Sequence, residues 1–398
     1  MDSGLLSDLK VLDLTRVLAG PFCTLQLADL GAEVVKVEMP DKGDDSRFYG
    51  PFIDGQSAYY LSLNRNKKSV TLNLKETRGK AIFKDLVSKF DVVVENFRPG
   101  TMEKWGLGYE ELSKVNPRLI YAAISGFGAS GPDSLKPAYD IVVQGKGGIM
   151  SVTGQEGGTP TRVGASIGDI TSGLFAVIAV LSAYINVLKT GRGNKIDLSM
   201  LDCQVAILEN AIARYVVSGR TPEPIGNRHP SITPFTTFKT SEDYVIVAAA
   251  NQKLWISLCY LIGLPELIND PKFENNELRT VNWELLEPIL SDAFAQKTAE
   301  EWVCLLEEQG IPCGIVQNIP QVLNDPQIIS RDMIRDLGVS DSSEQTIKVA
   351  GIPYKFSTSL PDKFMPAPTL GQNTQEILKK YAGVDSETCR SLKTDGVI

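Results

Sequence analysis

The sequence of 398 residues contains a single histidine, His229, and its six cysteines are scattered without a C-x-x-C pair. A site that needs two imidazole ligands, or a zinc site built on paired cysteines, is therefore excluded, and we predict no metal site. Isolated cysteines are typical of reduced thiols in a reducing compartment. A histidine-assisted triad can be built in only one way, around His229.

Phosphate-binding signatures are also missing. There is no G-x-x-x-x-G-K-[ST] motif, and the first predicted strand is followed by Arg16-Val17-Leu18-Ala19-Gly20-Pro21 where a dinucleotide fold has G-x-G-x-x-G. A nucleotide hydrolase or an ordinary dehydrogenase is disfavoured. The chain also lacks an excess of positive charge, because 40 Lys and Arg against 48 Asp and Glu leave a net charge of -8. This balance argues against nucleic-acid binding and against a protein that coats anionic membranes.

One apolar run, residues 170–188, carries no charge and is close in length to a membrane span. The glycine and serines within it, and the lack of a second such run, favour a helix buried in a large core. The first residues have neither the apolar core of a secretory signal nor the Arg-rich character of a transit peptide. We therefore expect no membrane association.

Short β-branched runs alternate with amphipathic segments in the N-terminal third. Strands are predicted at 11–14, 33–38, 69–74, 92–96 and 119–125, and helices at 22–30, 77–90 and 109–115. This alternation predicts an α/β fold with a parallel sheet that is covered on both faces, in a Rossmann-like large domain. Ligands of such sheets gather beyond the carboxyl ends of the strands, where the loop 95–100 falls.

The rest of the chain predicts a smaller α+β domain, followed by a C-terminal segment that packs again on the large domain. Two long helices are expected between 169 and 219, with a short strand at 195–199 between them. A proline-rich joint at 221–224 precedes a strand at 244–250 and helical segments to about 309. We predict a large domain at 1–220 that 330–398 complete, a small domain at 225–325, and a C-terminal segment at 326–398 that returns to the large domain.

Asp169 stands where the apolar helix is predicted to begin. The ordinary explanation is a helix N-cap that accepts backbone N–H bonds. The functional explanation is a nucleophile: the positive end of the helix would keep the carboxylate ionised in an apolar site, and Gly168 would leave space for a substrate.

A competing signal lies just before it. Gly164-Ala165-Ser166-Ile167-Gly168 matches the G-x-S-x-G nucleophile elbow of serine esterases, with Ser166 as nucleophile and His229 as the only available base. The strand that should precede such an elbow is weak.

A series of ordered motifs resembles the class III CoA-transferases, also called the CaiB/BaiF family, along nearly the whole chain. The motifs are Val11-Leu12-Asp13-Leu14 with Ala19-Gly20-Pro21, 29–38, 94–100, Lys136-Pro137-Ala138-Tyr139-Asp140, Gly168-Asp169, Gly226-Asn227-Arg228-His229-Pro230 and Gly310-Ile311-Pro312-Cys313-Gly314. The resemblance implies an interlaced homodimer in which the site lies between the large domain of one chain and the small domain of the other. It also implies a mitochondrial matrix enzyme whose transit peptide is absent from this chain; the other compartment we consider is the cytoplasm.

The activity that the resemblance implies is transfer of CoA from succinyl-CoA to a free dicarboxylic acid, with glutarate as the expected acceptor. Asp169 would attack the thioester to form an anhydride and then an aspartyl-CoA thioester. CoA thioesters are the substrates, and no tightly bound cofactor is expected. Transfer to another acid and racemisation of an α-methylacyl-CoA are the alternatives within the family, and a non-catalytic CoA-binding protein is the alternative outside it. Racemisation is disfavoured because 136–140 contain no histidine.

The resemblance also assigns binding residues. Tyr139 and Asp140 match residues beside the acyl group, and Met200 would line the CoA channel. Met39 stands where some members carry an arginine. The remaining residues expected to meet CoA are Val17, Leu18, Ala19, Leu72, Asn73, Lys75, Asn96, Phe97, Arg98, Lys104 and Lys136.

A dicarboxylate needs a cation for its distal carboxylate, preferably an arginine fork. Arg16, Arg47 and Arg228 are the sequence candidates, and His229 is expected to orient the loop that carries Arg228. Formyl-CoA:oxalate members of the family have a run of glycines where this chain has 226–230, so a different acceptor is implied.

Overall fold

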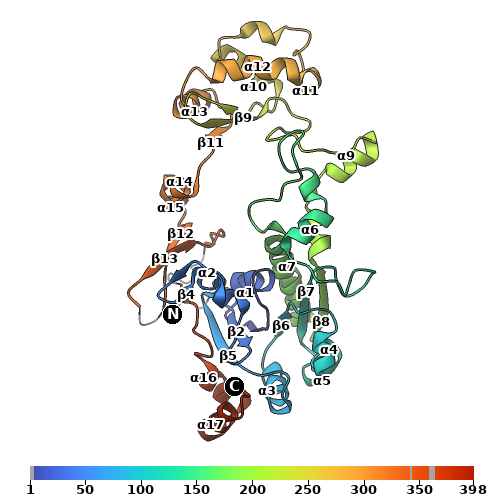
Figure 1. Cartoon of the computed structure of the whole chain (residues 1–398), viewed down its shortest axis with the longest axis vertical. Helices are drawn as coiled ribbons and strands as arrows, with labels where there is room; N and C mark the ends of the chain where they lie inside the picture. Colours follow the sequence, from blue (N-terminus) through green and yellow to red (C-terminus); the bar gives the residue numbers. More distant parts are fainter. Residues whose placement is uncertain (1–3, 341–342, 358–363) are drawn as a thin grey trace. The chain divides into compact units, whose positions relative to one another are not determined.

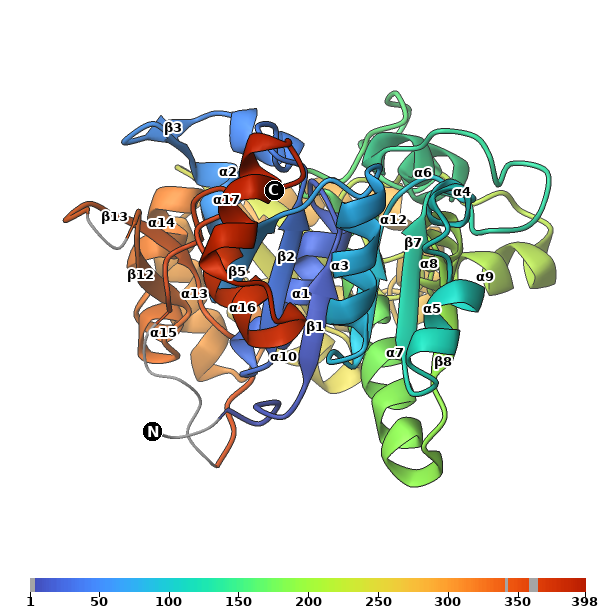
Figure 2. The same ribbon diagram turned by 90° about the horizontal axis from the view of Figure 1, so that it is seen from below.

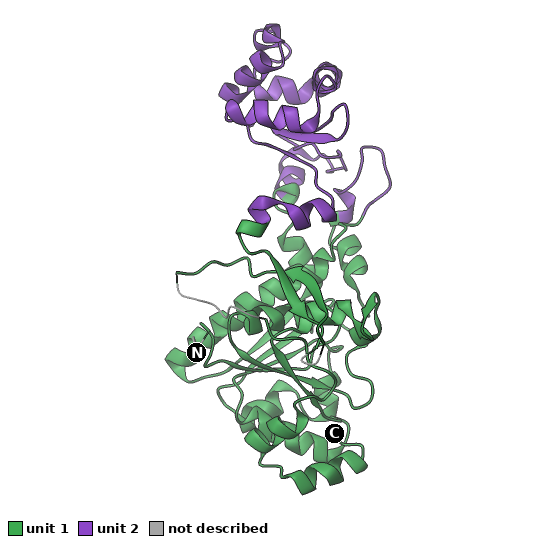
Figure 3. Cartoon of the chain, turned by 90° about the vertical axis from the view of Figure 1, so that its left-hand side faces the viewer, with its two compact units in different colours: residues 1–149, 162–212, 329–398 green, residues 150–161, 213–328 purple. Residues whose placement is uncertain are grey.

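The computed structural model describes residues 4–340, 343–357 and 364–398. The chain divides into two compact units, coloured separately in Figure 3: Met1–Ile149, Arg162–Ile212 and Ile329–Ile398 form the first, and Met150–Thr161 and Ala213–Ile328 form the second. Residues 150–161 therefore group with the second unit, although the predicted large domain at 1–220 included them. The C-terminal residues from 329 onward group with the first.

A six-stranded parallel sheet forms the centre of the first unit (Figure 1). Its spatial order is β5 (Lys67–Thr71), β2 (Glu33–Glu38), β1 (Lys10–Asp13), β6 (Val92–Glu95), β7 (Ile120–Ser125) and β8 (Asn194–Ser199), and every neighbouring pair is parallel. The predicted α/β class with a parallel sheet is confirmed. The direction of winding reverses between β1 and β6, and such a switch point is where open α/β sheets bind ligands.

The two faces of the sheet are covered by different helices because strand side chains alternate. Leu12, Val35 and Val93 pack against α3 (Thr77–Val87), α16 (Thr374–Ala382) and α17 (Ser386–Thr394). Figure 2 shows these three helices over one face. Val11 and Val92 pack on the other face against α1 (Ala19–Asp29) and α7 (Ile167–Thr190).

Shorter elements complete the first unit. They are α2 (Ala58–Asn64), α4 (Thr101–Trp105), α5 (Tyr109–Val115), α6 (Asp140–Lys146), α8 (Met200–Ala206), and the hairpins β3 (Phe52–Ile53) with β4 (Gln56–Ser57) and β12 (Ile334–Gly338) with β13 (Thr346–Ala350). The second long helix expected before residue 219 is wrong. It is replaced by α8 and α9 (Ala211–Ser218), because Glu209 between them has a φ of 53°, outside the helical region.

The second unit has a three-stranded antiparallel sheet of order β11 (Cys313–Ile315), β10 (Tyr244–Ala248) and β9 (Phe235–Lys239). One face of the sheet packs against helices through Val245, Val247, Trp255, Leu290 and Trp302. The helices of this region are α10 (Gln252–Leu261), α11 (Asn276–Val281), α12 (Trp283–Phe294), α13 (Ala299–Glu308), α14 (Ile319–Asn324) and α15 (Pro326–Ser330).

The apolar run is helix α7, which is long and apolar enough to cross a membrane by length and composition alone. In the structure Ala176, Val180 and Ala183 of α7 are buried against the core. A core helix passes the same test of composition. The other side of α7 remains open in the single chain, where Ile178 is 60% and Leu188 is 61% exposed.

Candidate active site

A cavity of about 290 Å³ lies where the parallel strands end at the switch point of the first unit. Strands β1, β6, β7 and β8 all reach it with the residues that follow their carboxyl ends. The residues that line it are Arg16, Val17, Leu18, Ala19, Asp45, Asn96, Phe97, Arg98, Pro99, Ile124, Ser125, Gly126, Lys136, Pro137, Ala138, Tyr139, Asp169 and Met200.

Asp169 is the one carboxylate that helix α7 brings to this cavity. It is the third residue of α7, and Ser166, not Asp169, occupies the N-cap position. Within the described part of the chain no hydrogen bond or ion pair holds the Asp169 carboxylate. Burial, with a smaller contribution from the charge of Asp140, raises the pKa of Asp169 to about 7. The expectation that Asp169 caps the helix is therefore wrong, and its raised pKa opposes the ionisation that was expected from the helix end.

Asp140 holds the start of α7 in place of a conventional cap. Its Oδ1 atom accepts the backbone N–H of Gly168 at 2.8 Å, and its Oδ2 atom accepts from Gln144 at 2.7 Å. A Cβ atom on Gly168 would lie 2.7 Å from Cγ2 of Val143 and 3.0 Å from Oδ1 of Asp140. Only glycine permits this close approach, so Gly168 and Asp140 together fix the turn that carries Asp169.

Tyr139 precedes Asp140 and begins α6 as its N-cap residue. Its side chain is 74% exposed and lines the cavity. Tyr139 and Asp169 thus share one cavity, and Asp140 is buried directly behind it.

A second, larger cavity of about 540 Å³ shares Arg16, Asp45, Phe97 and Arg98 with the first. It extends past the carboxyl ends of β2 and β5. The residues that line it are Leu14, Thr15, Arg16, Val37, Glu38, Met39, Lys42, Gly43, Asp44, Asp45, Leu72, Leu74, Lys75, Phe97, Arg98, Thr101 and Trp105.

Most residues that the family resemblance assigned to CoA line these two cavities. Val17, Leu18, Ala19, Lys136 and Met200 line the first, Leu72 and Lys75 line the second, and Asn96, Phe97 and Arg98 meet the first or both. Two assigned residues line neither cavity. Lys104 is exposed on α4, and Asn73 lies in the loop after β5, where its Oδ1 atom accepts the N–H of Lys75 at 3.1 Å.

Arg16 is the arginine best placed at the cavity that contains Asp169. Its guanidinium pairs with Asp45 at 3.2 Å and lies 5.5 Å from the ring centre of Phe97. Both members of the ion pair are about half exposed, so a ligand carboxylate can compete for Arg16 at little cost.

Arg47 does not fit the predicted role in binding a substrate carboxylate. Its Nε and Nη2 atoms donate to Glu38 at 2.8 and 2.6 Å, its guanidinium lies 3.8 Å from the ring centre of Tyr60, and the carbonyl of Pro368 accepts from both terminal nitrogens. The side chain is only 14% exposed and lines neither cavity. These contacts commit Arg47 to holding its own loop.

Arg228 and His229 belong to the second unit. Arg228 pairs with Glu156 at 2.7 Å, and Nδ1 of His229 accepts the N–H of Ser231 at 3.1 Å. Both line a cavity of about 700 Å³ within that unit, together with Arg214 and Arg220. Arg228 therefore lies at a cavity of the second unit that contains two further arginines.

The serine elbow does not form at Ser166. Residues 152–166 contain no strand, and Ser166 has an unstrained φ of -72°. A nucleophile elbow requires a strained residue between a strand and a helix. The G-x-S-x-G match is therefore a coincidence of small residues, and His229 already uses Nδ1 within its own loop.

Two buried acidic residues at the site were not predicted from the sequence. Glu95 ends β6 and accepts the N–H of Phe97 at 2.7 Å and the Tyr121 hydroxyl at 3.2 Å, and burial raises its pKa to about 7. Asp44 accepts the N–H of Val17 at 3.0 Å. The sequence held a signal for Glu95, which begins the loop 95–100 at the end of a predicted strand, and none for Asp44, which lies six residues beyond the predicted strand 33–38. Among the described residues no group of three or more His, Cys, Asp or Glu side chains could hold a metal.

Comparisons with known proteins identify the family that this chain resembles. A model of CoA-transferase family III matches residues 6–374. A succinyl-CoA:glutarate CoA-transferase of Mus musculus is 40% identical over 99% of this chain and 90% of its own. An acetyl-CoA:oxalate CoA-transferase of Acetobacter aceti is also 40% identical, over 95% of this chain and 96% of its own. The crystal structure of a CAIB/BAIF family protein from Brucella suis superposes with a TM-score of 0.85 at 36% identity, covering 96% of this chain and 100% of that one.

Proposed function

The chain belongs to CoA-transferase family III, and from this membership we propose that it transfers CoA from succinyl-CoA to a free dicarboxylic acid, with glutarate as the acceptor. Relatives with equal identity are named for glutarate and for oxalate, so the family alone leaves the acid open. Cysteine and metal chemistry are not needed for this reaction, because one carboxylate and the thiol of CoA carry every step.

Asp169 is the nucleophile that we propose. The observation that carries this role is its carboxylate, which lines the cavity without a partner among the described residues, beside the positions assigned to CoA. A partly desolvated carboxylate attacks a thioester carbonyl more readily than a solvated one.

The proposed reaction has two symmetric halves. The Asp169 carboxylate attacks the succinyl carbonyl and the C–S bond breaks, which gives a mixed anhydride and CoA thiolate. The thiolate then attacks the Asp169 carbonyl and releases succinate, which leaves an aspartyl-CoA thioester. Glutarate attacks that carbonyl, the thiolate leaves, and its attack on the glutaryl carbonyl frees glutaryl-CoA and the Asp169 carboxylate. The thioester bond is conserved throughout, so no ATP is consumed.

The chain's own residues supply binding and orientation. Asp140 and Gly168 hold the turn that carries Asp169, and Lys75, Arg98 and Lys136 offer cations to the phosphates of CoA. Arg16 is the residue that we propose for the distal carboxylate of the acid, since its present partner Asp45 is exposed. Tyr139 lies beside the acyl position in this proposal.

We further propose that the active enzyme is an interlaced homodimer in the mitochondrial matrix, without a tightly bound cofactor. The open apolar face of α7, with Ile178 and Leu188, supports a partner chain. Sedimentation should then give twice the 43.4 kDa of one chain, and fractionation of source cells should place the protein with matrix markers.

The test is CoA transfer from succinyl-CoA to a panel of glutarate, oxalate, mesaconate and citramalate, with product mass as the readout. We expect glutaryl-CoA with the unaltered protein and none with Asp169→Asn. Hydroxylamine should trap a hydroxamate at Asp169 only in the presence of acyl-CoA. The matched control is Ser166→Ala, which should keep full transfer. If another acid of the panel is the preferred acceptor, that acid replaces glutarate in the proposed function. If Ser166→Ala loses activity while Asp169→Asn keeps it, the proposed mechanism is overturned.

A further inference from the structure

Val17 adopts a backbone conformation that valine rarely takes. Its φ is 67°, in the left-handed region, where a β-branched side chain meets its own backbone. Such strain persists only where surrounding structure enforces it, and it concentrates at functional sites. Val17 lines the same cavity as Asp169 and directly precedes Leu18, the N-cap residue of α1.

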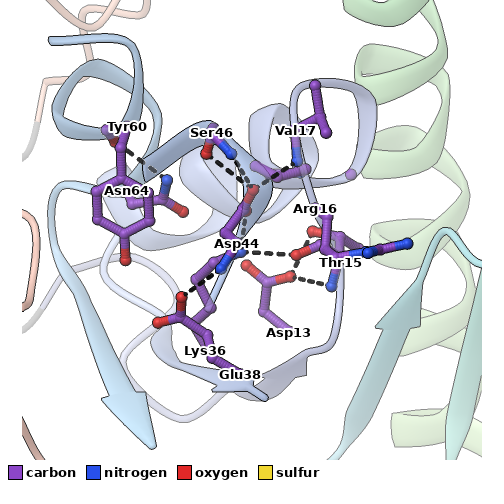
Figure 4. Close-up of polar contacts among 12 residues, drawn as sticks. Asp13, Thr15, Arg16, Val17, Lys36, Glu38, Asp44, Ser46, Tyr60 and Asn64 are labelled. Atoms are coloured by element: carbon purple, nitrogen blue, oxygen red, sulfur yellow. Dashed lines mark hydrogen bonds and ion pairs between the residues drawn. The ribbon is translucent and has the colours of Figure 1, made fainter. Parts of the chain in front are cut away.

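The backbone around Val17 is held by side chains from three other segments. The carbonyl of Thr15 accepts a hydrogen bond from Nζ of Lys36 at 2.6 Å. The side chain of Asn96 accepts the N–H of Arg16 and donates to its carbonyl, both at 2.8 Å. The N–H of Val17 donates to Oδ1 of Asp44 at 3.0 Å. The strained turn is thus fixed at three consecutive residues, as Figure 4 shows for the contacts of Thr15 and Val17.

Lys36 and Asp44 also hold each other. Nζ of Lys36 lies 2.9 Å from Oδ2 of Asp44, and both side chains are fully buried. The other oxygen of Asp44 accepts the N–H and the hydroxyl of Ser46 at 2.9 and 2.8 Å (Figure 4). Although burial opposes it, the charges of Asp13 and Asp44 raise the pKa of Lys36, so the pair stays ionised.

A buried ion pair is a costly way to stabilise a fold, because apolar residues of the same volume do as well or better. This pair does something that apolar residues cannot do. It places one donor and one acceptor against the backbone of the turn in which Val17 has a positive φ. The turn in question carries Arg16, Val17 and Leu18 into the cavity.

We propose that Lys36 and Asp44 are positioning residues for the acyl-CoA substrate: their buried pair holds Val17 in the left-handed conformation and so keeps the turn 15–18 in the form that binds CoA. The assignment of this turn to CoA rests on the proposed function. The contacts that hold the turn do not.

Loss of the pair should lower the fraction of molecules with a competent turn, and apparent affinity falls by that fraction. Asp44→Asn should raise both the KM for succinyl-CoA and the dissociation constant for CoA by roughly tenfold, with kcat at saturation much less affected. Hydrogen exchange in a peptide that covers 15–18 should accelerate. Asp41→Asn is the matched control, since Asp41 is an exposed carboxylate of the same loop, also at positive φ, and it should change none of these values.

Val17→Gly distinguishes positioning from general stability. Glycine takes a φ of 67° without strain, so the turn no longer needs the clamp. In the Val17→Gly background Asp44→Asn should raise KM by far less than it does with valine present. Equal effects in the two backgrounds would overturn the proposal, as would a lower melting temperature with unchanged KM, CoA affinity and exchange.

Ser46→Ala is the milder variant for the same measurements if Asp44→Asn fails to fold. It removes one bond that orients Asp44 and should give a smaller effect of the same sign, again relieved by Val17→Gly. If the unaltered protein transfers no CoA, the proposed function fails by itself, while hydrogen exchange still tests the clamp. Unchanged exchange at 15–18 in Ser46→Ala and Asp44→Asn would refute it.

Discussion

Asp169→Asn should abolish CoA transfer and at the same time stabilise the fold above neutral pH. The carboxylate is partly buried without a partner among the described residues, and burial together with Asp140 raises its pKa to about 7 from an ordinary 3.8. The folded chain therefore binds this proton more tightly than the unfolded chain does. Its contribution to stability is fully present at low pH and is lost as the pH rises from about 4 to about 7.

The size of this effect follows from the pKa difference. A rise from 3.8 to about 7 corresponds to at most about 4 kcal/mol of lost stability when the carboxylate is fully ionised. Solvent reaches part of the group and screens its charge, so we expect about 1–2 kcal/mol in practice. Asparagine keeps the shape of the side chain and cannot ionise, so it removes this loss.

The assay is urea unfolding of both proteins at about pH 4 and about pH 8. The difference in unfolding free energy between Asp169→Asn and the unaltered protein should become more favourable to the variant by about 1–2 kcal/mol at the higher pH. Asp85→Asn, at an exposed position on α3, is the control and should show no such change. An equal difference at both pH values would refute the claim that Asp169 is held in a desolvating site.

The pKa of Asp169 also predicts the pH dependence of the activity. Since the ionised carboxylate is the proposed nucleophile, kcat/KM for succinyl-CoA should fall about tenfold for each pH unit below about 7. A profile that stays level down to about pH 5 would contradict an unpartnered, buried nucleophile.

Three further outcomes are expected from the packing. Gly168→Ala should displace the start of α7 and reduce transfer by at least about tenfold, because its Cβ would meet the side chains of α6 below normal contact distance, whereas Gly164→Ala, with open space around it, should keep full activity. Lys67→Met should lower the unfolding free energy by about 3–5 kcal/mol in urea titration. It removes the ion pair in which Nζ of Lys67 lies 3.0 Å from Oδ2 of Asp13, and so leaves the buried Asp13 carboxylate without this partner. A thiol reagent applied to the native protein should label the exposed Cys304 and spare Cys23, whose burial raises its pKa to about 12, and labelling of both at one rate would show that the core opens.

The class of fold and the edge of the sheet that carries the site were accessible from the sequence. The short β-branched runs at 33–38 and 92–96 are typical of strands, and their alternation with amphipathic segments predicts a parallel sheet. Loops after parallel strands meet at one edge, which is why Arg16 and Asn96 line one cavity, and the start of α7 brings Asp169 to the same cavity.

Tertiary structure alone decided which charges are free to act. Arg47 and Arg16 look alike in the sequence. In the fold the guanidinium of Arg47 is bound by Glu38 and Tyr60, whereas Arg16 pairs only with an exposed carboxylate, that of Asp45, among the described ion pairs. The burial that raises the pKa of Asp169 was likewise not visible in the sequence. The pKa of a carboxylate depends on the burial and charges around it, and Asp140, which is distant in sequence, lies beside it only in the folded chain.

The same limit explains why the clamp on Val17 was not predicted. A helix period or a strand run is a local property that neighbouring residues determine, so α7 and β6 follow from the sequence. A positive φ at a valine is locally unfavourable, and it exists because Lys36, Asp44 and Asn96 reach the turn from other segments. Local sequence thus determined most of the elements and the edge of the sheet where their loops meet, while contacts between distant residues decided the ionisation, the strain and the availability of the groups at the site.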